Sequence, residues 1–366
     1  MILALFSRLR LAVPEISGEE RASLTWSFLW FFSLLFGYYL IRPLREGLAL
    51  QGDQDFLARL FLIVFFVMLA AVPAYGWLAT RFSRPQLVRV LYHGAAASLA
   101  LFSVWMFVLP NLSVEVHWQQ WTTGAFYVFV SVYNMFVVSL FWSVLADIFS
   151  SGQGKRLFGL VAAAGTTGGM CGSLVTATIV ERVGIPAILF GSAMTLECCI
   201  IAATRLEKAA QAMRQQSADV TPTPPTEAAG GGIWDGVVEI GKSPYLAAFC
   251  VFLLFGKMCA TTVYFAQNQI IPAHLPTSDA RAAFFGKVNM SVQIATLLLQ
   301  TFVAGQLMRR AGLIFTLVLI PMAYLMGFIA LGLAPVLGIV VLFDIAQRSV
   351  SYAIAVPARE VLFTVV

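Results

Sequence analysis

The chain is built from a succession of apolar runs that are each long enough to cross a lipid bilayer. The hydrocarbon core of a bilayer is about 30 Å thick, so a helix that spans it needs roughly 20 mainly apolar residues. Strands of a membrane β-barrel alternate in polarity at every second residue, whereas these runs are continuously apolar. Because 60% of the residues are hydrophobic and only 11% are charged, the chain also lacks the polar surface of a water-soluble domain. The pattern predicts an all-α membrane protein.

Ten transmembrane helices are predicted, with one long hydrophilic interruption. They are expected at 24–42, 60–80, 86–109, 122–148, 156–180, 184–204, 244–271, 284–308, 312–333 and 336–356. The interruption is rich first in Pro and Thr and then in Gly, a composition that cannot bury a core. We therefore expect an N-terminal six-helix half at 1–204, a cytoplasmic linker at 205–243 and a C-terminal half with four helices at 244–366.

Short matches between the two halves indicate a duplicated architecture. The stretch Leu34–Gly37 (Leu-Leu-Phe-Gly) recurs as Leu253–Gly256, and Gly76–Arg81 recurs loosely as Gly305–Arg310. Parallel repeats of this kind are typical of transporters with two six-helix halves. The second half would then be two helices short, so we expect twelve helices in the full protein and interpret this chain as truncated.

The distribution of Lys and Arg predicts a cytoplasmic amino terminus. Cytoplasmic loops of membrane proteins are enriched in these residues, and this orientation places most of the 23 Lys and Arg residues inside. The inside set consists of Arg8, Arg10, Arg21, Arg81, Arg84, Arg89, Lys155, Arg156, Arg205, Lys208, Arg214, Lys242, Arg309, Arg310 and Arg359. The smaller outside set consists of Arg42, Arg45, Arg59, Arg182 and Arg281.

The thiol and imidazole side chains predict neither disulfides nor a metal site. The five cysteines all lie inside apolar runs, and the three histidines are scattered along the chain. No Ser-His-Asp, Cys-His or paired-carboxylate arrangement is visible in the sequence, so we do not expect an enzyme, and no cofactor is predicted. The net charge of +5 is explained by loop arginines, and no nucleic-acid partner is needed to account for it.

The loop after the second predicted helix resembles a known signature. Gly76–Arg84 reads Gly-Trp-Leu-Ala-Thr-Arg-Phe-Ser-Arg, which is similar to the sequence G-x-L-A-D-R-x-G-R-R between helices 2 and 3 of the major facilitator superfamily. Thr80 stands at the position of the usual Asp. The resemblance implies a major facilitator-type bundle.

Three further stretches are similar to the ATP:ADP antiporter (nucleotide translocase) family, including its bacterial members. They are Tyr38–Glu46, then Val138–Asp147 with Lys155–Gly159 following it, and Tyr352–Val365. The resemblance implies a twelve-helix exchanger of the bacterial inner membrane, with a basic–acidic pair at the end of helix 1, a place that Arg45 and Glu46 occupy here. The implied partners are the lipid bilayer and a small anionic substrate such as a nucleotide, and we expect a monomer.

The end of the first predicted helix carries the charges that a ligand could use. Tyr38, Arg42, Arg45 and Glu46 are spaced to share one helix face. Two guanidiniums on one face suit a phosphate or carboxylate, because each can donate two hydrogen bonds at once. In the alternative, Arg42 and Arg45 lie at the interface between the membrane and the outside solution, with Glu46 as a local partner.

Two later helices carry polar stripes along otherwise apolar faces. The first stripe consists of Lys257, Thr261, Tyr264 and Asn268, and the second of Asn289, Gln293, Thr296 and Gln300. Such stripes line water-filled paths or join helices by hydrogen bonds. A buried lysine is costly unless it is paired, so Lys257 is predicted to contact an anionic substrate, together with Tyr264 and Asn268.

Other charged residues are candidates for a gate. Asp344 and Arg348 stand four residues apart and are expected to pair, either as a structural ion pair or as a gating element. Arg359 and Glu360 repeat the Pro-x-Arg-Glu pattern of 43–46. A cytoplasmic gate network is predicted from Arg81, Asp147, Lys155 and Arg156, for which solvated loop charges are the alternative.

The glycines at 165, 168, 169 and 172 superficially resemble a phosphate loop. No Gly-Lys-Ser/Thr follows them and no strand is predicted before them, so close helix packing is the favoured interpretation.

All these features together predict a secondary transporter, driven by exchange or cation coupling, that carries an organic anion such as ATP, ADP or another phosphorylated metabolite by alternating access. The alternatives are a facilitator-type carrier of peptides, sugars or drugs, and a membrane sensor or subunit that has the fold without transport.

Overall fold

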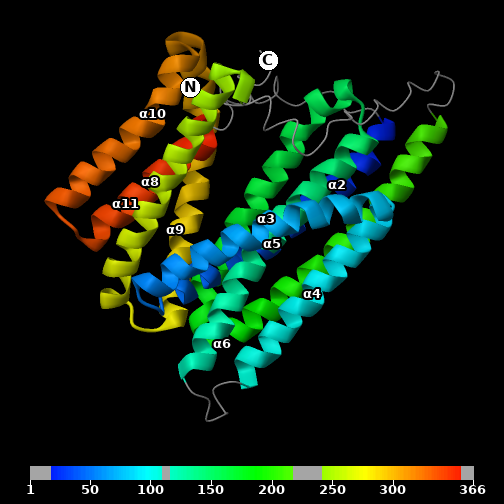
Figure 1. Cartoon of the computed structure of the whole chain (residues 1–366). Coiled ribbons are helices and arrows are strands. Elements are labelled where there is room, and N and C mark those ends of the chain that lie inside the picture. Colours follow the sequence, from blue (N-terminus) through cyan, green and yellow to red (C-terminus); the bar gives the residue numbers. More distant parts are fainter. Residues whose placement is uncertain (1–17, 109–115, 217–240, 356–366) are drawn as a thin grey trace. The chain divides into compact units, whose positions relative to one another are not determined.

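The computed structural model describes residues 18–108, 116–216 and 241–355, and every regular element in these ranges is helical (Figure 1). The elements are α2 (Gly18–Ala49), α3 (Gln54–Arg81), α4 (Arg84–Val108), α5 (Val116–Ile148), α6 (Ser151–Gln216), α8 (Pro244–His274), α9 (Ser278–Leu299), α10 (Gly305–Leu333) and α11 (Leu337–Val350). Two short π-helical segments follow α9 and α11, at Gln300–Ala304 and Ser351–Ala355. The predicted all-α architecture is confirmed.

The long helix α6 contains two of the predicted spans. Its backbone leaves helical geometry at Gly184, where φ is 79°, a value that glycine adopts without the steric penalty of a β-carbon. Within the described residues nine helices are long and apolar enough to cross a membrane, and one of these, Leu157–Met213, includes the break at Gly184. The predicted spans 156–180 and 184–204 therefore share α6. The predicted boundary near 308–312 is wrong, because the span 284–308 runs from α9 through the π-helical segment Gln300–Ala304 into α10, which begins at Gly305.

Helix α2 is longer than the sequence predicts. The predicted span ends at residue 42, where charged residues begin, whereas the helix continues to Ala49. The segment Glu20–Ala49 of this helix is long and apolar enough to cross a membrane. The difference arises because the charges near its end are covered by neighbouring helices, so that charge marks the end of the apolar run and not the end of the helix. Consequently Arg42, Arg45 and Glu46 lie within the helix.

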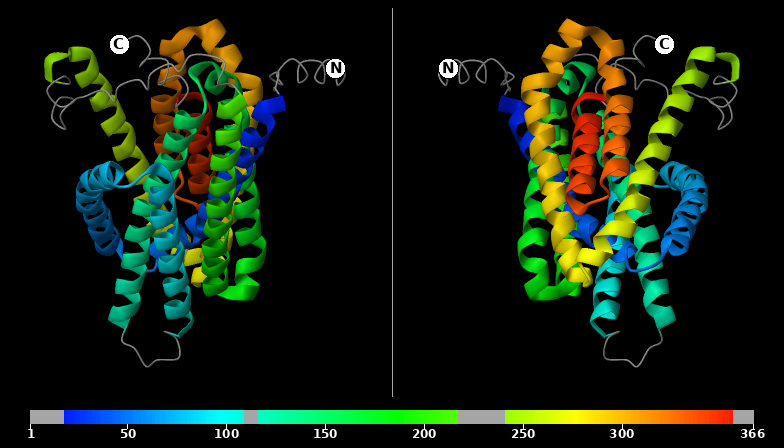
Figure 2. Two further views of the ribbon diagram at one scale, coloured as in Figure 1. Left: turned by 90° about the vertical axis from the view of Figure 1, so that its right-hand side faces the viewer. Right: turned by 90° about the vertical axis from the view of Figure 1, so that its left-hand side faces the viewer.

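The chain forms two compact units. Among the described residues, the first unit contains α2 to α6 and α9 up to Gln293. The second unit contains α8, α9 from Ile294 onward, α10 and α11. In the second unit α10 and α11 lie side by side (Figure 2).

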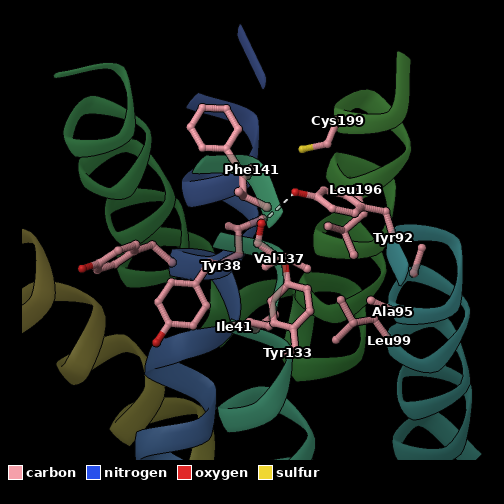
Figure 3. Packing of buried hydrophobic residues seen from close by; sticks show 14 of the residues in the cluster. Tyr38, Ile41, Tyr92, Ala95, Leu99, Tyr133, Val137, Phe141, Leu196 and Cys199 are labelled. Carbon is pink, nitrogen blue, oxygen red and sulfur yellow. Dashed lines mark hydrogen bonds between the residues drawn. The ribbon is translucent and has the colours of Figure 1, made fainter. Parts of the chain in front are cut away.

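Helix α2 is central to the core of the first unit, because it packs along α6 and also contacts α5. Its Trp30 and Phe31 lie against Phe141 of α5, with ring centroids 5.1 Å and 4.4 Å from that ring. Figure 3 shows Phe141 in the core with the buried Tyr92 of α4, which donates a hydrogen bond of 3.0 Å to the carbonyl oxygen of Val137. Aromatic packing thus fixes α2 against the helices that surround it.

Glycines let α6 approach α2 at backbone contact. A β-carbon at Gly168 would collide with the carbonyl oxygen of Phe32, and one at Gly172 would collide with that of Phe36. The hydroxyl of Thr176 donates to the carbonyl oxygen of Leu40 at 2.9 Å along the same contact. The interpretation of this glycine run as a helix-packing surface is confirmed.

Candidate functional site

Three charged side chains form a largely buried cluster near the end of α2. The Arg42 Nε donates to Glu46 Oε1 at 3.0 Å, and the Arg45 Nη2 lies 4.0 Å from the same oxygen. The side chains of Arg42 and Arg45 are 13% and 16% exposed, and that of Glu46 is 5% exposed. Glu46 is a local partner of both arginines, as the alternative interpretation expected, and the contacts form among surrounding helices. The predicted role of the arginines in binding a ligand stays a prediction. Two guanidiniums face one carboxylate here.

Tyrosines from two helices surround the guanidiniums. Arg42 donates through Nη1 to the hydroxyl of Tyr39 at 3.0 Å, and its Cζ lies 5.3 Å from the centre of that ring. Arg45 lies 5.0 Å from the ring centre of Tyr127 of α5 and donates to Ser131 Oγ at 3.4 Å. These cation–π and hydrogen-bond contacts orient both guanidiniums.

Helix α9 contributes a further partner to the cluster. The Nδ2 of Asn289 donates to Glu46 Oε2 at 3.0 Å, and Asn289 is fully buried. Asn289 begins the second predicted polar stripe, of which Gln293 and Thr296 are also buried. The stripe was therefore a signal in the sequence, although its pairing with Glu46 joins residues 243 apart and is not a local pattern.

Tyr38 lies in the hydrophobic core near this cluster. It is 7% exposed and meets Tyr39 edge to face, at 5.3 Å between ring centroids. Figure 3 places it in the same packed group as Ile41 and Tyr133. A crevice of about 760 Å³ opens beyond the end of α2, lined by Leu48, Gln51 and Ser278 among others, and the arginines do not line it. Its walls are mostly apolar.

The predicted substrate residues of the second unit lie on α8. Lys257 is exposed and Tyr264 is half-buried, whereas Asn268 is buried at 8% exposure. Gln267, beside Asn268, is buried as well. These three residues stay predicted substrate contacts.

A second buried ion pair lies on α11. Arg348 Nη1 donates to Asp344 Oδ2 at 3.1 Å, and the two side chains are 11% and 8% exposed. Gln347 donates to the other oxygen of Asp344 at 3.1 Å and accepts a hydrogen bond from the hydroxyl of Tyr324 of α10 at 3.0 Å. The predicted pairing of Asp344 with Arg348 is confirmed, while the choice between a structural and a gating role stays a prediction.

The predicted gate residues have differing surroundings. Asp147, at the end of α5, pairs with Arg84 at 3.1 Å, and both side chains are substantially exposed. Arg84 belongs to the loop motif but was not among the predicted gate residues. Arg81 is exposed and lies over the Trp77 ring, 4.7 Å from its centre. The side chains of Lys155 and Arg156, and the whole of Arg359 and Glu360, lie outside the described residues.

Comparisons with known proteins identify the fold. No protein-family model and no curated protein sequence matches the chain. Among solved structures, a point mutant of the nucleoside transporter NupG is similar at a TM-score of 0.62 and 14% identity, over 93% of this chain and 82% of that chain. A second structure of NupG is similar at a TM-score of 0.60 and 13% identity, over 95% and 82%. The chain is an all-α membrane protein with a major facilitator-type fold, as predicted.

Proposed function

We propose that the protein is a secondary transporter that moves an organic anion, with phosphate groups as the part that it recognises, by alternating access. The observation that carries this proposal is the buried cluster of Arg42, Arg45 and Glu46. Charged side chains inside a membrane protein are costly and usually face one another or a water-filled path. The fold is one in which substrates bind near the middle of the membrane between two helical halves.

The charge balance of the cluster favours an anionic ligand. Two guanidiniums and one carboxylate sum to a net formal charge of plus one among these three side chains. An interior of low polarity strengthens the attraction between this excess charge and an anion. Each guanidinium can hold a phosphate through two parallel hydrogen bonds, which gives geometric selection as well as attraction.

The ring-bearing neighbours of the cluster favour a nucleotide over a simple phosphate ester. Tyr38 and Tyr39 lie on the same helix as the arginines, and Tyr127 lies on α5 beside Arg45. Tyrosine rings stack on nucleobases, and because the faces of Tyr39 and Tyr127 hold the guanidiniums, stacking here requires the arginines to turn toward the ligand. The resemblance to the ATP:ADP antiporter family supports the same substrate class. We therefore propose ATP and ADP as the first substrates to test, carried by exchange or with a coupled cation.

Nucleoside transport is the second candidate, because two of the similar solved structures are of a nucleoside transporter. A nucleoside is uncharged, so it would not use the excess positive charge of the arginine cluster. Lys257, Tyr264 and Asn268 of the second unit stay proposed contacts for either substrate. A sensor with this fold would bind a ligand without moving it.

Counterflow into proteoliposomes tests the proposal. The protein is reconstituted with or without internal ADP, and uptake of labelled ATP and of labelled uridine is followed. Arg45→Gln removes one guanidinium of the cluster, and Arg59→Gln on α3, which is exposed, serves as the matched control. We expect ATP uptake that depends on internal ADP, a large loss in Arg45→Gln and none in Arg59→Gln. Uridine uptake that Arg45→Gln leaves unchanged would establish the nucleoside carrier instead.

A further inference from the structure

The carboxylate of Glu46 is shared between two kinds of partner. Its Oε1 accepts from Arg42 at 3.0 Å, and its Oε2 accepts from Asn289 of α9 at 3.0 Å. Glu46 is 4% exposed and Asn289 is fully buried. One buried side chain thus neutralises part of the arginine cluster and at the same time binds a helix that arrives from far along the sequence.

The first part of α9 is seated closely on α2 and α6. A β-carbon at Gly47 would lie 2.9 Å from the amide nitrogen of Ala282, and one at Gly286 would lie 2.8 Å from that of Ala177. Two glycines therefore allow α9 to reach backbone contact with both helices. Because a contact this close leaves little room for sliding, α9 must separate from α2 if the two are to move independently.

Hydrogen bonds also hold the first part of α9 against the end of α2 and the residues that follow it. The buried Arg281 donates to the carbonyl oxygen of Leu50, beyond the end of α2, at 2.9 Å. Gln51 and Ser278 are hydrogen-bonded near the start of α9. The bond between Asn289 and Glu46 is the member of this set that reaches the arginine cluster, through the Glu46 carboxylate. It is therefore the contact that a ligand at the arginines can disturb.

Helix α9, which carries the Asn289 contact to Glu46, is divided between the two compact units. Its residues up to Gln293 belong to the first unit, and its remaining residues belong to the second. Alternating access requires one half of a transporter to move against the other. The attachment of α9 to α2 holds the first-unit part of a helix whose remaining residues belong to the second unit.

We propose that Glu46 is an internal competitor for the anion site and that its displacement releases α9. A phosphate-bearing substrate that binds Arg42 and Arg45 replaces the Glu46 carboxylate there, and the displaced carboxylate leaves Asn289. Asn289 is then a positioning residue, because it acts through Glu46. A ligand with two or more negative charges neutralises the two guanidiniums better than a single carboxylate does, whereas an uncharged ligand cannot displace it. This inference rests on the proposed function and specifies how its site is regulated.

Two substitutions separate the two roles of Glu46. Glu46→Gln removes the negative charge but keeps an oxygen that can accept from Asn289, so the affinity for ATP should rise at least fivefold. Asn289→Leu keeps the carboxylate on Arg42 but removes the bond to α9, so backbone amides of 278–293 should exchange hydrogen faster without any ligand. Asn134→Leu on α5, a partly buried asparagine, is the matched control and should change neither quantity.

Hydrogen exchange of 278–293, with and without ATP, is measured beside ATP binding and counterflow on the same purified samples. We expect ATP to speed exchange in the unaltered protein and to have no further effect in Asn289→Leu. Exchange in Asn289→Leu equal to that of the unaltered protein overturns the inference, whatever the transport result. So does ATP counterflow by a protein whose α9 exchange does not respond to ATP, and in that case the proposed function stands. Absence of ATP binding and uptake in a folded protein overturns the proposed substrate and, with it, the competition.

Discussion

The two units each contain a buried pair of an arginine and an acid four residues apart on one helix, and the pairs differ in charge balance. On α2 the pair of Arg42 and Glu46 has a second guanidinium, Arg45, within 4.0 Å of the same carboxylate oxygen. On α11 the pair of Asp344 and Arg348 is completed by the neutral side chain of Gln347. A balanced pair has no excess charge to offer a ligand, whereas an unbalanced one attracts an anion. We therefore propose that the α2 cluster recognises the substrate and that the α11 pair contributes to stability.

The largest effect is expected from breaking the balanced pair. Arg348→Gln removes the cation 3.1 Å from the buried Asp344, and loss of one partner of a buried ion pair costs about 3–5 kcal/mol. The free energy of unfolding of the purified protein in detergent should fall by that amount. In the double variant Asp344→Asn, Arg348→Gln most of the loss should be recovered, because no unmatched charge is left. If the double variant is as unstable as Arg348→Gln, the ion pair contributes to stability by more than cancelling the charge of Asp344.

The unbalanced cluster should respond in activity and not in stability. Arg45→Gln leaves Arg42 paired with Glu46, so we expect an unfolding free energy within about 1 kcal/mol of the unaltered protein. The kcat/KM for ATP uptake should fall roughly 100-fold, which corresponds to about 2.8 kcal/mol of lost interaction with a charged ligand. Counterflow kinetics and thermal unfolding on one preparation measure both quantities. If Arg45→Gln lowers the free energy of unfolding by as many kcal/mol as it costs in kcat/KM, the proposed difference in role between the α2 cluster and the α11 pair is contradicted.

Glycine substitutions sharpen the comparison of packing in the two units. Gly168→Ala in α6 brings a methyl group against the carbonyl oxygen of Phe32, and overpacking of this kind costs about 1–3 kcal/mol. Gly256→Ala in α8 meets no atom within 4 Å, and an alanine there should stabilise the helix by up to about 1 kcal/mol. Thermal unfolding of the two variants checks the opposite signs. Destabilisation by Gly256→Ala would mean that this face of α8 is covered in the membrane.

The smallest effect is expected at the exposed pair of Arg84 and Asp147. Their side chains are 41% and 53% exposed, and ion pairs at such sites contribute about 0–1 kcal/mol. Arg84→Gln should therefore leave the unfolding free energy nearly unchanged, while uptake kinetics report any gating role. A loss of uptake at unchanged stability would favour the predicted gate over the interpretation as solvated charges.

The helices could be predicted from the sequence because a bilayer requires each span to be long and apolar. The boundary between the predicted spans 156–180 and 184–204 agrees with the backbone break at Gly184. The end of α2 could not be predicted, since it depends on which helices cover a charge. The charged residues after position 42 end the apolar run, yet the helix continues to Ala49 because its neighbours bury those charges.

The buried polar contacts also differ in whether they could be predicted, according to whether the partners are close in sequence. Arg42 with Glu46 and Asp344 with Arg348 could be predicted because residues four apart on a helix are neighbours. The contact of Asn289 with Glu46 could not, because it depends on how α9 packs on α2. The polar stripe that begins at Asn289 did indicate a buried or water-lined face, but no partner.

The most direct test of the central claim is the dependence of recognition on ligand charge. Adenosine, AMP, ADP and ATP are compared as inhibitors of labelled ATP counterflow, in the unaltered protein and in Arg45→Gln. If the two guanidiniums of the α2 cluster recognise phosphate, inhibition should strengthen with each added phosphate, and this gradient should flatten in Arg45→Gln. Equal inhibition by all four compounds, or strongest inhibition by adenosine, would contradict the account.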